Sequence, residues 1–119
     1  MPEPVFEKDQ YFVTKNINHV TKKFERTYFK ILSIRFDKEK YIQGFRVQRC
    51  EFKHTKTIIV PIDDGKDKKL KKQDVYNLQP NNEKPIYYKY NLMHWLNHEL
   101  YKGCDRLLNN EELTKYIDT

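Results

Sequence analysis

One segment constrains the fold more than any other: residues 26–36, with the sequence RTYFKILSIRF. Aromatic and β-branched side chains dominate it, and these residue types favour a pleated strand over a helix. Residues 41–52 have the same character and follow the charged residues 37–40, which predict a hairpin turn. We therefore expect the two segments to pair as central strands of an antiparallel sheet.

Shorter strands are predicted on either side of this pair. Residues 10–14 (QYFVT) form the first, and a polar loop over residues 15–23 follows it. Residues 53–55 are expected to turn the chain into a further strand over residues 56–62, where Pro61 is typical of a sheet edge or a strand end. The chain between residues 10 and 62 is thus predicted to form a β meander.

The apolar pattern changes its parity within the second long strand. Phe45 and Val47 fall in one alternating register, whereas Cys50 falls in the other. An extra residue in a strand shifts the alternation, so we expect a β-bulge near Gln48. Gly44 has no side chain and permits a bend or the close approach of another chain segment.

The period of the sequence changes after residue 90. Asn91 is a good N-cap, and an apolar stripe follows at helical spacing, consisting of Leu92, Leu96, Leu100, Gly103 and Leu107. Residues 91–117 are therefore predicted to be helical, with Trp95 and Leu96 buried against the sheet.

The fold class predicted by these elements is α+β: a small antiparallel β-sheet or an SH3-like barrel followed by a C-terminal helix or helices. The chain has 119 residues, of which 38% are apolar and 14% aromatic, enough for one modest core. We therefore expect a single domain over residues 1–119. It comprises an extended arm (1–9), a β-rich core (10–80) and the C-terminal helical segment (91–117).

Positive charge is concentrated in the middle of the chain. The formal net charge is +6, made up of −1 over residues 1–20, +9 over residues 21–72 and −2 over residues 73–119. Clustered Lys and Arg attract polyanions, such as nucleic acid or an acidic protein surface. Lysines on exposed strands also prevent edge pairing, so a purely solubilising surface explains the same composition.

Five basic residues of the two long strands are the candidate contacts with nucleic acid or a protein partner: Arg26, Lys30, Arg35, Arg46 and Arg49. Side chains alternate between the faces of a strand, so neighbouring strands can gather basic residues on one face. Arginine and lysine neutralise phosphate, and exposed aromatic rings stack on unpaired bases. Most aromatic residues are needed for the core, which leaves the five cations as the expected contacts.

Catalytic and metal-binding patterns are weak. His94 and His98 are four residues apart on the predicted helix, but a zinc site needs two more ligands, and only Glu99 or Cys104 lies nearby. Cys50 and Cys104 have no paired spacing and are expected to be reduced thiols. The three glycines are isolated, so they build no phosphate-binding loop. We expect no cofactor and no metal, and we assign no catalytic residue.

These features favour a small basic binding module, not an enzyme, that engages nucleic acid through a basic β-surface. One alternative is an accessory or inhibitor protein of a phage or mobile element that blocks an acidic protein partner. A second is a small endoribonuclease of the MazF type, because such enzymes combine a basic barrel with few catalytic residues. The longest apolar run, at residues 57–62, is too short to span a membrane, and the N-terminus is unlike a signal peptide, so we expect a cytoplasmic protein.

Overall fold

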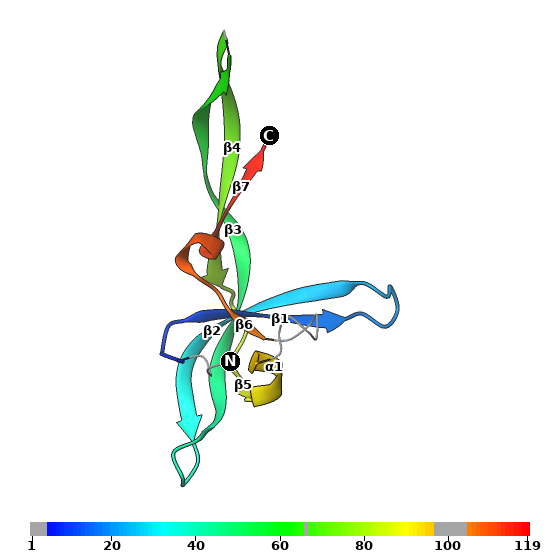
Figure 1. Ribbon diagram of the computed structural model, residues 1–119, viewed down its shortest axis with the longest axis vertical. Helices are drawn as coiled ribbons and strands as arrows, with labels where there is room; N and C mark the ends of the chain where they lie inside the picture. Colours follow the sequence, from blue (N-terminus) through cyan, green and yellow to red (C-terminus); the bar gives the residue numbers. More distant parts are fainter. Residues whose placement is uncertain (1–4, 66, 97–104) are drawn as a thin grey trace. The chain divides into compact units, whose positions relative to one another are not determined.

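The computed structural model describes residues 5–65, 67–96 and 105–119, which are built almost entirely of β-strands (Figure 1). Their strands are β1 (Tyr11–Ile17), β2 (Phe24–Phe36), β3 (Ile42–Asp64), β4 (Asp67–Pro80), β5 (Ile86–Lys89), β6 (Arg106–Leu107) and β7 (Thr114–Asp118). One short helix, α1 (Leu92–Leu96), follows β5, and a 3-10 turn (Asn110–Leu113) precedes β7. The strands hydrogen-bond in the order β6-β1-β2-β3-β4-β7, and β5 pairs with β3.

The chain divides into two compact units. The first comprises residues 1–50 and 80–109, and it contains β1, β2, β5, β6, α1 and the first part of β3. The second comprises residues 51–79 and 110–119, and it contains the rest of β3, most of β4, and β7. Strand β3 therefore contributes residues to both units.

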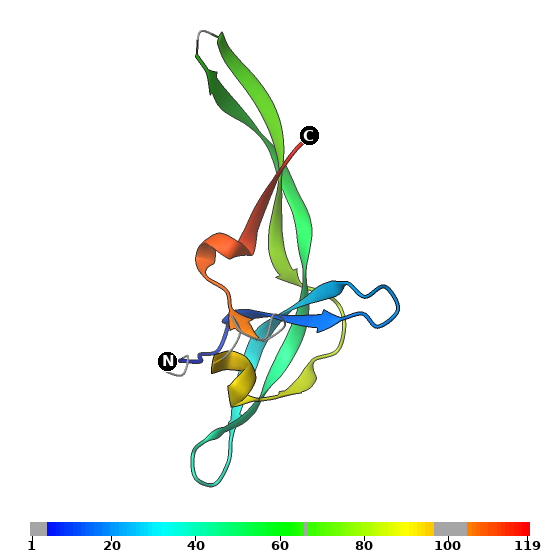
Figure 2. The same ribbon diagram turned by 45° about the vertical axis from the view of Figure 1, so that its right-hand side comes forward.

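An aromatic cluster forms the core of the first unit. Phe12 of β1 lies directly opposite Phe29 of β2, with ring centroids 5.3 Å apart, and Phe45 of β3 lies 6.2 Å from Phe12. Trp95 of α1 and Phe6 join the cluster, with their rings edge to face at 4.7 Å. The antiparallel strands form a curled, half-barrel sheet (Figure 2), and these side chains make up its core. Large buried rings supply most of the hydrophobic stabilisation available to so small a core.

The second unit is a long hairpin with one added strand. β3 and β4 form the hairpin, which turns at Gly65, where a φ of 71° suits a residue without a side chain. β7 pairs antiparallel with the C-terminal half of β4. Contacts between strands hold the unit together: the Thr55 hydroxyl donates to the Val75 carbonyl at 3.0 Å, and the Lys115 ammonium lies 4.0 Å from the centre of the Phe52 ring.

The antiparallel strands predicted between residues 10 and 62 are confirmed, but their connection at residues 53–55 is wrong. β3 runs through these residues without interruption as far as Asp64. Polar side chains in this part of β3, such as that of Thr55, bond across to β4. In a two-stranded ribbon both faces can be exposed, so a run of polar residues need not end a strand.

The predicted bulge at Gln48 is also wrong. The register of β2 and β3 shifts at two other places, which leave Leu32 of β2 and Gln43 of β3 without an opposite residue. The buried positions of β3 nevertheless switch from odd-numbered to even-numbered residues, since Val47 and Cys50 are both buried. The half-buried Gln48 between them bonds through its side-chain amide to the segment that follows β4, which accounts for its partial burial.

The predicted C-terminal helical segment is wrong, and with it the α+β class. α1 covers only Leu92–Leu96, residues 97–104 lie outside the described residues, and residues 105–119 contain the strands β6 and β7. Leu107, the last residue of the predicted helical stripe, belongs to β6 and lies directly opposite Phe12 of β1. A five-residue helix depends on packing rather than on its own hydrogen bonds. None of the helices in the described part of the chain is long and apolar enough to cross a membrane.

The predicted burial of Trp95 is confirmed, because this residue is only 3% exposed. The prediction for Leu96 falls on a side chain that lies outside what the structure describes.

Replacing Trp95 with alanine is expected to lower the free energy of unfolding by about 3–5 kcal/mol, since truncation leaves a cavity in the aromatic core. Denaturant unfolding followed by circular dichroism measures the change. An unchanged midpoint would show that α1 adds nothing to the stability of the sheet.

Candidate nucleic-acid interface

The strands of the first unit have one face turned to the aromatic core and one turned away from it. Directly opposite residues of an antiparallel pair share a face, and successive residues of a strand alternate. Phe45 and Val47 of β3 are buried in the core. Arg46, between them, therefore lies on the opposite side of the sheet, which we call the outer face.

Arg35 and Arg46, two of the five predicted contact residues, are neighbours on the outer face. Arg46 lies directly opposite Ser33 of β2, and Gly44, two residues before it, lies directly opposite Arg35. Such diagonal neighbours are about 7–8 Å apart at the backbone, which is within reach of long side chains. Tyr87 of β5 lies opposite Arg46 on the other side of β3, so three strands contribute to the same patch.

The other three predicted contact residues lie elsewhere. Lys30 and Arg26 occupy even-numbered positions of β2, whereas the buried Phe29 is odd-numbered, so both cations lie on the outer face. They are closer to the β1–β2 hairpin than Arg35 is. Arg49 lies directly opposite Phe29, and therefore on the core side of the sheet. The register thus separates Arg49 from the other four cations.

The five cations also differ in their charge environment. Lys30 Nζ lies 3.8 Å from a carboxylate oxygen of Asp9, and a guanidinium nitrogen of Arg49 lies 3.7 Å from a carboxylate oxygen of Glu83. Within the described ranges, no ion pair involves the remaining three, which are Arg26, Arg35 and Arg46. These three charges are therefore available to an external anion.

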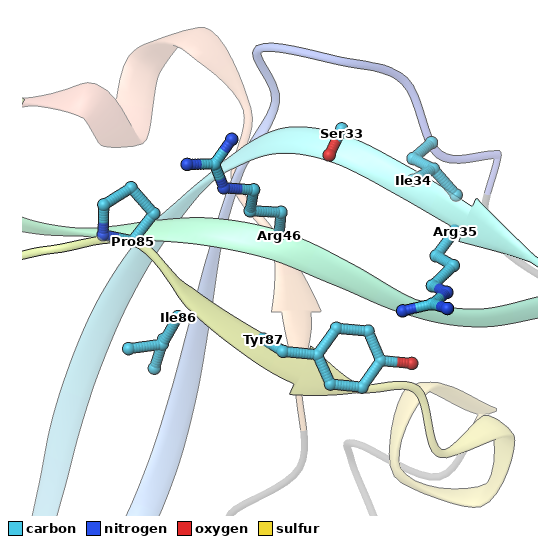
Figure 3. A pocket seen from close by; sticks show the side chains of 7 residues that line it. All are labelled: Ser33, Ile34, Arg35, Arg46, Pro85, Ile86 and Tyr87. Carbon is cyan, nitrogen blue, oxygen red and sulfur yellow. The ribbon is translucent and has the colours of Figure 1, made fainter.

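An open groove of about 440 Å³ lies over the patch that contains Arg35 and Arg46 (Figure 3). Its lining residues all belong to the first unit: Ser33, Ile34, Arg35, Arg46, Pro85, Ile86 and Tyr87. Figure 3 shows the Arg35 guanidinium group and the Tyr87 hydroxyl extending toward one another from opposite sides of β3. No carboxylate is among these lining residues. The groove therefore combines uncompensated positive charge with an aromatic surface.

Gly44 makes this arrangement possible. A Cβ atom at this position would overlap the phenol end of Tyr87 and would lie 2.6 Å from the carbonyl oxygen of Tyr88. The Tyr87 phenol therefore rests on the bare backbone of β3, where a larger residue would displace it. The close approach predicted at Gly44 is confirmed, and β5 is the segment that makes it.

Tyr87 and Lys89 are absent from the contact residues predicted from the sequence. Alternation within β5 would have identified them, because Tyr88 packs against the aromatic core and its two neighbours along the strand must face away. Lys89 lies opposite Gly44, which places it across β3 from Arg35. The outer face therefore gathers a third cation beside the groove.

The second unit contains a polar cluster that superficially resembles a catalytic triad. The Thr57 hydroxyl donates a 2.6 Å hydrogen bond to Asp74, and His54 Nε2 lies 3.2 Å from the same carboxylate oxygen. The same imidazole nitrogen lies 3.4 Å from the Thr57 hydroxyl. In a triad, the carboxylate and the hydroxyl contact different imidazole nitrogens, so this cluster cannot relay a proton in that way. It stabilises the exposed hairpin.

In the described part of the chain, no group of three or more His, Cys, Asp or Glu residues is placed to hold a metal ion. The side chain of His94, and all of His98, Glu99 and Cys104, lie outside the described residues. The Cys50 side chain is buried and its Sγ lies 3.4 Å from the Gln48 carbonyl oxygen, and burial makes it unsuited to act as a nucleophile.

Comparison with known proteins adds no assignment to the groove. No family model matches the chain, and neither does any curated protein or solved structure.

Replacing Gly44 with alanine is expected to destabilise the first unit by about 1–3 kcal/mol, as overpacking does. The added methyl group would collide with the Tyr88 carbonyl, which belongs to the backbone and cannot swing away. Denaturant unfolding measures the loss. The control is Ser33→Ala on the same face, which adds no atoms and should change stability by less than about 0.5 kcal/mol. Equal stability of the two variants would show that β5 does not press on β3.

Replacing Thr57 with valine is expected to raise the pKa of Asp74 toward its ordinary value of 3.8. That pKa is lowered in the folded protein, mainly because the Thr57 hydroxyl donates to the carboxylate, with a further contribution from His54. A lowered pKa stabilises the fold above the unfolded-state pKa, and this contribution is lost as the pH falls through the folded-state value. The variant should therefore lose less stability on acidification. Titration of the Asp74 carboxyl carbon by NMR measures the shift, and an unchanged pKa would contradict the assignment.

Proposed function

We propose that this chain is a non-enzymatic nucleic-acid-binding module whose contact surface is the outer face of the first unit. One observation carries the proposal. Arg35 and Arg46 are exposed, have no ion pair within the described residues, and line one groove together with Tyr87. Two guanidinium groups without an ion partner among the described residues raise the local positive potential of the groove, and this potential attracts an anion.

The chemistry of the groove suits phosphate. A guanidinium group can bind a phosphate through two parallel N–H···O hydrogen bonds, which are stronger than hydrogen bonds between neutral groups. The hydroxyl groups of Ser33 and Tyr87 add neutral donors to the same groove. Along β2, Arg26 extends the positive surface toward the β1–β2 hairpin, whereas Lys30, between Arg26 and Arg35, is paired with Asp9. An extended row of cations suits a polymer of phosphates better than a single small anion.

The two alternative functions have less support. Among the described residues that line the groove, none is the His, Asp or Glu that an endoribonuclease would use as a general acid or base. An acidic protein surface would be attracted by the same arginines, but it offers no unpaired base to the exposed ring of Tyr87. We expect the module to act in the cytoplasm.

Reversing both groove arginines (Arg35→Glu with Arg46→Glu) is expected to weaken oligonucleotide binding at least about tenfold, because each charge-assisted contact is worth about 1.5–3 kcal/mol. Fluorescence anisotropy with labelled oligothymidylate, repeated over a range of salt concentrations, measures the affinity. Wild-type affinity should fall as salt rises, with a logarithmic slope of about −0.7 for each phosphate contacted on a single strand. The double variant should show a shallower slope.

The matched control reverses two exposed lysines of the second unit, Lys56 and Lys72, which changes the net charge by the same amount. These lysines also have no ion pair within the described residues. If the two double variants lose affinity equally, binding responds to net charge alone, and the groove is not the contact surface. Circular dichroism establishes that each variant is folded.

A further inference from the structure

The ring of Tyr87 is exposed in a way that the packing of β5 does not require. Its side chain is 52% exposed, whereas the adjacent Tyr88 packs 5.2 Å from Phe12 in the aromatic core. The Tyr88 hydroxyl also donates a 2.7 Å hydrogen bond to the buried Asp105. Tyr88 thus anchors β5 to the core, and Tyr87 is left over for another role.

The Tyr87 ring is also held in one place. Its phenol end rests on Gly44, and Arg35 lies directly opposite Gly44 on the next strand. Figure 3 shows the face of the ring turned toward the groove, with the Arg35 guanidinium group near its hydroxyl end. A side chain that is already fixed loses little conformational entropy when a ligand packs against it.

We propose that the Tyr87 ring is a stacking platform for an unpaired base, and that the protein therefore prefers single-stranded nucleic acid to a duplex. This inference rests on the function proposed above. Arg35 and Arg46 hold the phosphates that flank a nucleotide, and the base of that nucleotide lies on Tyr87. At about 440 Å³, the groove falls within the range of about 300–1,000 Å³ typical of sites that enclose small ligands, which is sufficient for one nucleotide.

A duplex fits this arrangement poorly. Its bases are stacked on each other, so their faces are inaccessible to a ring that lies on the surface of a sheet. Every base has a face that can stack on an aromatic ring, and in this proposal the two groove arginines contact phosphates and not base edges. The site is therefore expected to discriminate weakly among sequences and strongly between paired and unpaired strands.

Three ligands of equal length test the inference: oligothymidylate, an abasic strand with the same number of phosphates, and a duplex of mixed sequence. Stacking on one aromatic ring is worth about 1–3 kcal/mol for each base. The wild-type protein should therefore bind oligothymidylate about 5- to 150-fold more tightly than the abasic strand. This comparison needs no variant, so it is independent of any effect of mutation on folding.

Two variants then assign the preference to Tyr87. Tyr87→Ala should bind oligothymidylate and the abasic strand with equal affinity, because only the phosphate contacts remain. Tyr87→Phe keeps the ring and should keep most of the preference. A preference retained by Tyr87→Ala would overturn the assignment to this residue.

The outcomes separate the inference from the proposed function. Equal wild-type affinity for oligothymidylate and the abasic strand overturns the stacking platform but leaves phosphate binding at the groove in place. Tighter binding to the duplex also overturns it. If none of the three ligands binds, even at low salt, the proposed function itself fails, and an acidic protein becomes the partner to test.

Discussion

The packing of Phe12 against Phe29 and Phe45 fixes the register of β1, β2 and β3, and the rest of the first unit depends on that register. A slip of one residue would turn Phe45 to solvent and Arg46 into the core. Burying an unpaired guanidinium group is far more costly than exposing a ring, so the register is strongly specified. The contacts that hide the aromatic rings therefore also decide which arginines meet on the outer face.

The long strands could be predicted because their local preferences agree with their final environment. Residues 26–36, rich in aromatic and β-branched types, do form the greater part of β2. The C-terminal segment behaves differently. Leu92 and Leu107 fit a helical spacing, yet Leu107 pairs with Phe12 because β1 offers a free edge far away in the sequence. A distant edge leaves no signal in a local pattern, so the helix prediction failed there.

The candidate site was predictable only in part. Charge alone identified Arg35 and Arg46 among five basic residues, but it could not show which charges are already compensated. Arg49 is paired with Glu83, a contact between segments far apart in the sequence. Tyr87 was missed because the composition indicates only that most aromatic residues are needed for the core, and not which of them are exposed. The pairing of β5 with β3 places this ring on the outer face, directly beside Arg46.

A surface that serves solubility alone would not need this combination of residues. Any charged side chain keeps a protein in solution, and the lysines of the second unit would do so without a groove. The first unit instead places arginines beside an exposed ring. It also uses Gly44 inside a strand, where glycine is typically about 0.5–1 kcal/mol less stable than alanine. Alanine cannot replace it because Tyr87 and Tyr88 occupy the space. Glycine is thus the residue that this close approach of β5 requires, and the bare backbone of β3 holds the Tyr87 ring on the outer face beside Arg46.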